Sequence, residues 1–337
     1  MRKEAAKITL GHGGGGRLAY QLLRQLILPR LDNPVLSELT DAAVIKHNFR
    51  LAFSTDSFVV YPLFFSGGDI GKLAVFGTVN DLVMVGAQPE YLSLAFILEE
   101  GLEFRVLERI VKSISEAAHK AGVRFVTGDT KVVERGACDK IFINSSGIGR
   151  LIRGIRLGPR YISKGDRIIV TGAIGQHGLA VLTKRNNLSL DFDVVSDCAP
   201  LADLLLPILK NSCGIKFMRD PTRGGLATTL NEIAEATGLA VFVDEAEIPI
   251  DSRVRAACEL LGIDPLYLAC EGRALLVVKK ESVSDIISQL HRHRLGHKAR
   301  VIGEIVSRPC AKVILKTVAG GSRILDMLTN EPLPRIC

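Results

Sequence analysis

Strand-like and helix-like patterns alternate along this chain, and the alternation restarts near residue 160. Residues 51–60 (LAFSTDSFVV) predict a strand broken by polar residues at its middle, and residues 103–120 predict a helix that stops at Gly122. Around residue 160 the stretch GPRYISKGD has the Gly and Pro content of a linker, and a new strand pattern, DRIIVTG, begins at its end. The 337 residues suffice for about two domains at roughly 150 residues each. We therefore expect two units, each with its own core.

The second unit repeats this mixture and then gives way to a tail. Helical spacing recurs at about 200–210 and 224–236, and strand patterns recur in LAVFVDE, RALLVVKK, ARVIGEIV and AKVILKT. From Gly320 onward the periodicity fades, and the ending NEPLPRIC contains Pro332 and Pro334. Prolines at that spacing exclude a helix and favour an extended arm.

Charge and hydropathy argue against two broad classes of protein. The net charge of +7, from 43 Lys and Arg against 36 Asp and Glu, is mild, the basic residues are scattered, and no Trp is present to stack on bases. We therefore do not expect binding to nucleic acid. No apolar run in the sequence approaches the ~20 residues of a membrane-spanning helix, and the N-terminal stretch MRKEAAKITLGHGGGG lacks the apolar centre of a secretory signal. We expect a cytoplasmic protein that does not enter a membrane.

Cysteine and histidine do not form metal-site patterns. The seven cysteines are an odd number and include no Cys-x-x-Cys pair, so neither a disulfide framework nor a cysteine-rich zinc site is expected. Most of these thiols are interpreted as small buried apolar groups. His291, His293 and His297 lie among arginines at the end of a predicted helix, and we interpret them as part of a solvated basic face.

Acidic residues recur at predicted strand ends and turns, each beside Thr, Ser, Asn or Gly. They are Asp41, Asp56, Asp81, Asp129 and Asp220. Magnesium takes hard oxygen ligands, and it binds through a few carboxylates together with substrate phosphates. Each aspartate alone is equally compatible with the cap of a turn or a helix. Five such contexts in one chain favour a metal–nucleotide site.

Three further positions are compatible with both a chemical and a structural role. The first is the glycine loop GHGGGG at 11–16, which could bring backbone N–H groups to phosphate or could be a plain loop. The second is the segment RGG at 223–225, which opens a predicted helix and could bind an anion there or simply start the helix. Glu271, in ACEGRALLVV, enters an apolar strand pattern. If it is buried, its pKa is raised and it can serve as a base or a hydrogen-bond partner; otherwise it is a turn residue.

Cys337 is the last residue of the chain and follows Pro-Arg-Ile. The seven residues from Glu331 to Cys337 can span roughly 23 Å. A thiol on a tether of that reach can accept a group at one place and deliver it at another. The alternative is an incidental terminal thiol. Prenylation does not fit, because its signal places the cysteine fourth from the end.

Five stretches carry a family resemblance that extends from the glycine loop to Cys337. They are FSTDSFVVYPLFFSGGDIGKLAVFGTVNDL, AFILEEGL, VTGDTKVVERG, MRDPTRGG and EPLPRIC. In these stretches the chain resembles the HypE family of hydrogenase maturation proteins, which are carbamoyl dehydratases. The terminal PRIC together with VTGDTK is highly specific. The broader fold resembles the PurM-like superfamily of aminoimidazole ribonucleotide synthetase and selenophosphate synthetase.

The resemblance implies a mixed α/β PurM-like fold in three parts. An ATP-binding and dimerisation domain spans 1–158, a second domain spans 159–319, and a mobile arm spans 320–337 and ends in Cys337. The resemblance also implies a homodimer whose N-terminal sheets pack into a barrel, with ATP and Mg²⁺ in a cleft between domains and subunits. The implied partners are a carbamoyltransferase of the HypF type and the HypC–HypD assembly complex that receives the cyano group.

The resemblance also implies roles for individual positions. The magnesium–nucleotide residues are Asp41, Asp56, Asp81 and Asp220. The other nucleotide contacts are Asn80, Thr127, Gly128, Asp129 and Thr130. Lys131 and Glu271 are placed around the modified cysteine, and Cys337 carries the carbamoyl group that ATP-dependent dehydration turns into a cyano group. The loop reads HGGGG where the family has HGAGG or HGSGG, so the role of His12 stays open.

Two other functions remain to be weighed. A small-molecule synthetase or kinase similar to selenophosphate synthetase is expected to carry Cys or selenocysteine in the glycine loop, and GHGGGG has neither. Such an enzyme would turn over ATP without a modified Cys337. A non-catalytic assembly scaffold whose tail docks on a partner would hydrolyse no ATP at all.

Overall fold

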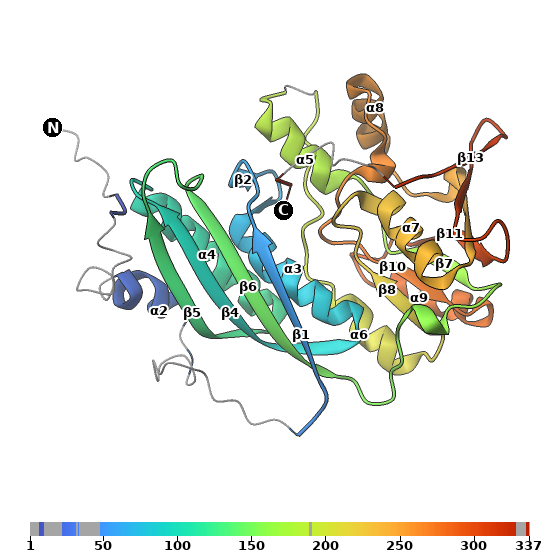
Figure 1. The fold of residues 1–337 in the computed structure, drawn as a ribbon, viewed down its shortest axis with the longest axis horizontal. Coiled ribbons are helices and arrows are strands. Elements are labelled where there is room, and N and C mark those ends of the chain that lie inside the picture. The colour runs from blue at the N-terminus through green and yellow to red at the C-terminus, as the bar shows by residue number, and fades with distance from the viewer. Residues whose placement is uncertain are drawn as a thin grey trace.

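Two sheets, each backed by helices, form the body of the molecule (Figure 1). The computed structural model describes residues 7–9, 22–31, 33, 48–188, 191–327 and 335–336. The first sheet comes from the first half of the chain, and the chain passes to the second sheet between Leu151 and Arg167. This mixed α/β architecture was predicted by the alternating patterns and by the resemblance.

The first sheet has the strand order β1-β6-β4-β5. Its strands are β1 (Leu51–Phe58), β6 (Ile141–Leu151), β4 (Ala87–Glu99) and β5 (Arg124–Val133). The β4–β5 pair is parallel and the other pairs are antiparallel. One face is covered by helices α3 (Ile70–Met84) and α4 (Phe104–Ala121) (Figure 1). The other face exposes apolar side chains, among them Phe53 and Ile97.

Local sequence explains two of these elements directly. Helix α4 buries Leu107, Ile110 and Ile114, which recur at helical spacing, and it ends at Gly122 in the left-handed conformation, with a φ of 67° that favours glycine. Both its spacing and its stop were predicted. Strand β1 was expected to break at its polar middle, and this was wrong. The strand is continuous because Asp56 and its neighbours pair in register with Ser145 and the rest of β6.

Short elements connect and flank the first sheet. The hairpin of β2 (Phe64–Phe65) and β3 (Gly68–Asp69) leads into α3, where the Asp69 side chain accepts a hydrogen bond from the backbone N–H of Lys72. This is an ordinary N-cap. A π-helical turn, η2 (Leu23–Ile27), continues into α2 (Leu28–Leu31) beside α4.

The second sheet has seven strands in the order β13-β12-β9-β11-β7-β10-β8, and only the β12–β9 pair is parallel. The strands are β7 (Arg167–Val170), β8 (Ile215–Arg219), β9 (Ala240–Asp244), β10 (Leu275–Val278), β11 (Arg300–Val306), β12 (Val313–Lys316) and β13 (Ser322–Ile324). The helices are α5 (Gln176–Arg185), α6 (Ala202–Asn211), α7 (Gly225–Thr237), α8 (Ser252–Leu261) and α9 (Val283–His291). Four 3-10 turns complete this half: η4 (Pro159–Tyr161), η5 (Glu245–Glu247), η6 (Pro265–Tyr267) and η7 (Lys280–Ser282). None of the described helices is both long and apolar enough to cross a membrane.

A buried amide joins the two halves. Asn80 on α3 is 1% exposed, and its Nδ2 donates to the carbonyls of Ala199 (3.1 Å) and Glu271 (3.3 Å). Its Oδ1 accepts from the backbone N–H of Leu201 (2.9 Å). Helix α6, which begins just after Leu201, packs against α3 at this junction. One side chain therefore fixes two loops of the second half against the main helix of the first.

Replacing Asn80 by alanine should weaken this junction. Asn80→Ala leaves buried backbone groups of Ala199 and Leu201 without partners, and we expect the free energy of unfolding to fall by about 2–4 kcal/mol. Denaturant unfolding monitored by circular dichroism measures the change. Asn211→Ala, at an exposed helix end, is the matched control and should cost under about 1 kcal/mol. Equal stability of the two variants would contradict the role of Asn80 in joining the two halves.

Candidate active site

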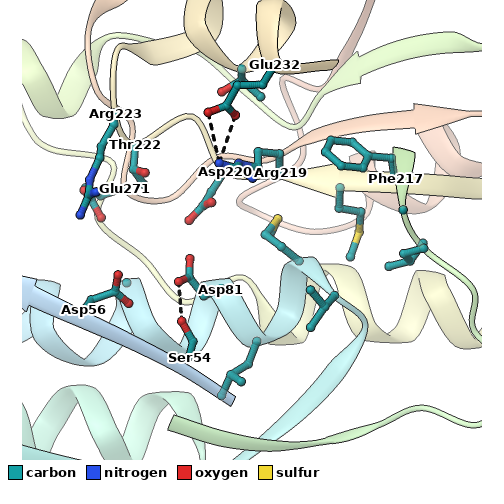
Figure 2. A pocket seen from close by; sticks show the side chains of 18 of the residues that line it. Ser54, Asp56, Asp81, Phe217, Arg219, Asp220, Thr222, Arg223, Glu232 and Glu271 are labelled. Carbon is teal, nitrogen blue, oxygen red and sulfur yellow. Dashed lines mark hydrogen bonds and ion pairs between the residues drawn. The ribbon is translucent and has the colours of Figure 1, made fainter. Parts of the chain in front are cut away.

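A cavity of about 580 Å³ lies where the two halves meet (Figure 2). One wall comes from β1 and α3, which contribute Asp56 and Asp81. The opposite wall comes from the turn after β8, which contributes Asp220 and Arg223. Glu271, in the loop before β10, also lines the cavity. Carboxylates thus face one another across the cavity, from segments far apart in the sequence (Figure 2).

The turn MRDPTRGG is shaped by its glycines. Strand β8 ends at Arg219 and helix α7 begins at Gly225, as the sequence predicted for RGG. Gly224 has a φ of 65°, and a Cβ at this position would collide with the hydroxyl of Thr228. Only glycine therefore lets the chain turn sharply here. The turn brings Arg223 to the lining of the cavity, where its positive charge acts on Asp56.

The aspartates of the two walls oppose one another's ionisation. Burial and, after it, the charge of Asp81 raise the pKa of Asp56 to about 6. The same two causes, in the same order, raise the pKa of Asp220 to about 7. Asp81 accepts a hydrogen bond from the hydroxyl of Ser54 (2.7 Å). Carboxylates whose ionisation is held back by mutual repulsion are stabilised when a cation enters between them.

These residues fit a magnesium ion shared with phosphates. Mg²⁺ is usually bound by one or two carboxylates together with substrate phosphates and water. Asp56, Asp81 and Asp220 supply the carboxylate oxygens on both walls. Within the described ranges no three His, Cys, Asp or Glu side chains are already gathered closely enough to hold an ion alone. Phosphate oxygens would therefore be needed to complete the coordination.

Glu271 is a buried carboxyl without a fixed side-chain partner. It is 2% exposed, and its Oε1 makes no hydrogen bond to the described residues. Burial and, after it, the charge of Asp220 raise its pKa well above the usual range, which favours the protonated, neutral carboxyl. Its backbone N–H donates to Asp197 Oδ1 (3.1 Å), which fixes the residue in place. A carboxyl in this state can exchange a hydrogen bond or a proton with a ligand in the cavity.

The predicted nucleotide motif VTGDTK lies elsewhere in the same chain. Thr127, Gly128, Asp129, Thr130 and Lys131 are on β5, at the opposite edge of the first sheet from β1. Three strand spacings separate these edges, which is roughly 14 Å. Lys131 is exposed, and its Nζ forms an ion pair with Asp129 Oδ1 (2.9 Å). The structure therefore does not bring Lys131 and Glu271 together within one chain.

Several predicted site residues lie outside the described residues. These are Asp41, the glycine loop at 11–16 with His12, and Cys337. Asn80 is described, and its amide is engaged in the junction between the two halves. His291, His293 and His297 each make a local hydrogen bond at the end of α9, to Ala299, Leu295 and Arg294.

The sequence also misplaced or missed some groups. Asp56, Asp81 and Asp129 were expected at strand ends or turns, and this was wrong. Asp81 lies within α3, and Asp56 and Asp129 lie within β1 and β5. Sequence reasoning missed Asp197 and the part that Ser54 and Arg223 play in the cavity, although Arg223 lies in the recognised motif MRDPTRGG. Of the six cysteines before the terminal one, four are buried, as expected for small apolar groups. The other two, Cys213 and Cys310, are exposed, so that interpretation does not apply to them.

Comparison with known proteins assigns the fold to a class. Residues 39–151 match the N-terminal domain of AIR synthase related proteins, and residues 163–316 match their C-terminal domain. The thiamine-monophosphate kinase of Stenotrophomonas maltophilia, at 20% identity and a TM-score of 0.67 over 95% of this chain and 100% of that one, shares the fold alone. The fold of the two sheets is thus that of the AIR synthase related, PurM-like class.

Closer relatives define the family within that class. Carbamoyl dehydratase HypE of Cupriavidus necator is 46% identical over 336 residues, which covers 99% of this chain and 96% of the relative. The chain belongs to the HypE family of carbamoyl dehydratases. A crystal structure of a HypE in complex with ATP is 46% identical, with a TM-score of 0.95, over 98% of this chain and 99% of that one. The HypE of a HypE–HypF complex is 43% identical, with a TM-score of 0.80, over 91% of this chain and 99% of that one.

The raised pKa values predict a dependence of stability on pH. Because Asp56 and Asp220 bind protons more tightly when folded, they stabilise the fold below about pH 4, and this contribution is lost as pH rises to about 7. Asp220→Asn should therefore raise the free energy of unfolding at pH 8 by about 1–2 kcal/mol and flatten the decline between pH 4 and pH 7. Thermal unfolding across this pH range measures the effect. The exposed Asp191→Asn is the control, and an identical pH profile for both variants would refute the assignment.

Proposed function

We propose that this chain uses ATP to dehydrate an S-carbamoyl group on Cys337 to an S-cyano group, which supplies cyanide ligands for the iron of a NiFe hydrogenase. The observation that carries this proposal is the position of Ile336, the residue bonded to Cys337. Ile336 is 3% exposed, and its carbonyl accepts a hydrogen bond from His177 at the junction of the two halves. Ile336 therefore lies at the junction, where His177 bonds to Ser196 and the next residue, Asp197, accepts the backbone N–H of Glu271.

The reaction needs ATP because the oxygen of a carboxamide is a poor leaving group. Transfer of the γ-phosphoryl group from ATP to the carboxamide oxygen forms an O–P bond and releases ADP. Loss of both N–H protons and cleavage of the C–O bond then release phosphate and leave S–C≡N on the cysteine. Oxygen departs with the phosphate, and no electrons are gained or lost. Tethering the carboxamide to the chain raises its effective concentration at the nucleotide.

The described residues suit the separate tasks of this reaction. Asp56, Asp81 and Asp220 would hold Mg²⁺, which when bound neutralises phosphate charge and positions the γ-phosphoryl group. In its neutral form Glu271 can donate a hydrogen bond to the carboxamide oxygen. In its ionised form, which nearby positive charge favours, it is a stronger base than an exposed carboxylate and can remove an N–H proton.

Assembly with other chains completes the proposal. A homodimer would bring Lys131 and the rest of VTGDTK from one subunit to the cavity of the other, where Lys131 could stabilise charge developing on oxygen. Residues 1–158 and 159–319 would act as the two domains, and 320–337 as the arm. A HypF-type carbamoyltransferase is the proposed donor of the carbamoyl group, since a HypE relative forms a complex with HypF. A HypC–HypD complex is the proposed acceptor of the cyano group.

Intact-mass analysis of the full-length chain tests the function directly. After incubation with carbamoyl phosphate, ATP and the carbamoyltransferase, we expect a mass gain of one carbamoyl group, followed by the ATP-dependent loss of one water. ATP turnover that needs no modified cysteine would favour a small-molecule synthetase. The absence of any ATP hydrolysis would favour a scaffold.

Cys337→Ala should remove the modification without harming the fold. We expect the variant to bind ATP but to acquire neither a carbamoyl nor a cyano group, because the attacking thiol is gone. Cys310→Ala, which removes an exposed thiol elsewhere in the chain, should be modified as the unaltered chain is. Peptide mass mapping locates the label, and label on any cysteine other than Cys337 would exclude the proposed nucleophile.

Glu271→Gln should separate chemistry from binding. The variant keeps the size of the side chain but cannot transfer the proton, so we expect single-turnover dehydration to slow by about a hundredfold or more, with ATP affinity within a few-fold. Glu232→Gln, on the cavity wall but paired with Arg219 (3.1 Å), is the matched control. Dehydration at the normal rate in Glu271→Gln would remove Glu271 from the mechanism.

A further inference from the structure

The last two described residues, Arg335 and Ile336, are held by groups from several distant segments. Ile336 is 3% exposed and belongs to the same core cluster as Val181, Cys198 and Ala269 from the second half of the chain. That cluster otherwise consists mainly of side chains from the first sheet and its helices. The C-terminal isoleucine therefore occupies a socket at the junction, although it is only one residue from the end of the chain.

His177 is the polar group of this socket. It is fully buried near the start of α5, with its ring edge-on to Phe65, and its Nε2 lies 3.0 Å from the carbonyl oxygen of Ile336. Its Nδ1 lies 2.8 Å from the hydroxyl of Ser196, which itself accepts from the backbone N–H of Cys198. Burial lowers the pKa of His177, so the ring is neutral and carries a single proton.

The hydrogen-bond partners settle where that proton lies. A carbonyl oxygen can only accept, so Nε2 of His177 carries the hydrogen and donates it to Ile336. Nδ1 is then the acceptor, and the Ser196 hydroxyl donates to it. The arrangement uses every donor and acceptor of the ring once. His177 is thus fixed as a donor aimed at the backbone of the tail.

Arg335 is held through both its backbone and its side chain. Its carbonyl oxygen accepts from the backbone N–H of Tyr61 (3.2 Å) and from Nη2 of Arg185 (2.7 Å). Its guanidinium donates to the carbonyl of Val59 (2.8 Å) and forms an ion pair with Asp139 (2.9 Å). Two residues of tail therefore engage both halves of the molecule.

A short segment connects this socket to the candidate catalytic carboxyl. Ser196 bonds to His177, and the next residue, Asp197, accepts the backbone N–H of Glu271. The position of the Ile336 carbonyl is therefore fixed relative to Glu271 through two consecutive residues, Ser196 and Asp197. Cys337 follows Ile336 directly, and one residue extends the chain by roughly 3.5 Å.

We propose that Arg335 and Ile336 form a docking anchor for the end of the chain, and that His177 is the positioning residue that sets the register of the terminal cysteine. This inference rests on the proposed function, in which the cysteine carries the reacting group. Because one residue separates the anchor from the thiol, docking limits where the carboxamide can lie. Individual hydrogen bonds contribute modestly, so the anchor can release and allow the thiol to visit a second protein.

Limited trypsin digestion of the full-length chain measures docking without any need for activity. Trypsin cuts after Arg335, and intact mass reports the loss of the Ile336–Cys337 dipeptide. Docking should protect this bond in the unaltered chain. His177→Leu removes the donor and should accelerate the cut by about tenfold, whereas His177→Gln, whose amide can donate in the place of Nε2, should restore most of the protection.

A second variant on the tail keeps the test valid if His177→Leu does not fold. Ile336→Ala empties the apolar socket and should accelerate the same cut by about tenfold or more. Cleavage of short free peptides that carry the unaltered and the Ile336→Ala tail sequences corrects for the effect of the substitution on trypsin's own substrate preference. Val318→Ala, which changes an exposed side chain, should leave the rate unaltered. Equal cleavage rates in the unaltered chain, His177→Leu and Ile336→Ala would overturn the anchor.

Single-turnover dehydration of the carbamoylated chain then tests positioning. At saturating ATP, His177→Leu should slow the conversion of carbamoyl to cyano by about tenfold with unchanged ATP affinity, and His177→Gln should recover it. Lost protection with a normal conversion rate would overturn the positioning role. If the unaltered chain performs no dehydration, the proposed function fails, while the protection of Arg335 still decides whether the anchor exists.

Discussion

The candidate active-site cavity depends on the buried amide of Asn80. Its three hydrogen bonds hold the loops at Ala199–Leu201 and Glu271 against α3, and the cavity is the space left between the walls that this contact fixes. The cost of burying a polar amide is met only when all its partners are in place. The hydrogen bonds therefore select one relative position of the two halves, which apolar packing between α3 and α6 alone would not do. Substituting Asn80 would disturb the site even though the side chain does not line the cavity.

Holding the two halves together brings acidic groups closer than they would otherwise lie. Asp56 and Asp220 come from opposite walls, and burial together with Asp81 raises the pKa of both. Burial at the junction likewise raises the pKa of Glu271. A bound metal–nucleotide complex would relieve the repulsion between these carboxylates. The affinity for that ligand and the pH dependence of stability therefore have the same physical cause, which is the crowding of buried acidic groups.

The sequence predicted those parts of the structure whose pattern is local. Helix α4 and its stop at Gly122 follow from amphipathic spacing and from glycine, and the turn before α7 follows from RGG. Helix α3 gave no such pattern, because twelve of its fifteen residues are buried and its apolar side chains lie on every face. Asp56, Asp81, Asp220 and Glu271 were singled out by residue type, and the structure gathers them around one cavity. The socket of His177 could not be predicted, since it joins residues 159 positions apart through a buried ring and a backbone carbonyl.

The measurement that tests the central claim most directly is a crystal structure of the carbamoylated full-length chain with a non-hydrolysable ATP analogue and Mg²⁺. The account predicts that Ile336 remains in its socket with its carbonyl on His177. The carboxamide on Cys337 should then lie within hydrogen-bond distance, about 3 Å, of the Glu271 carboxyl. A carboxamide bound elsewhere, with Glu271 still lacking a partner and Ile336 outside the junction, would contradict the account.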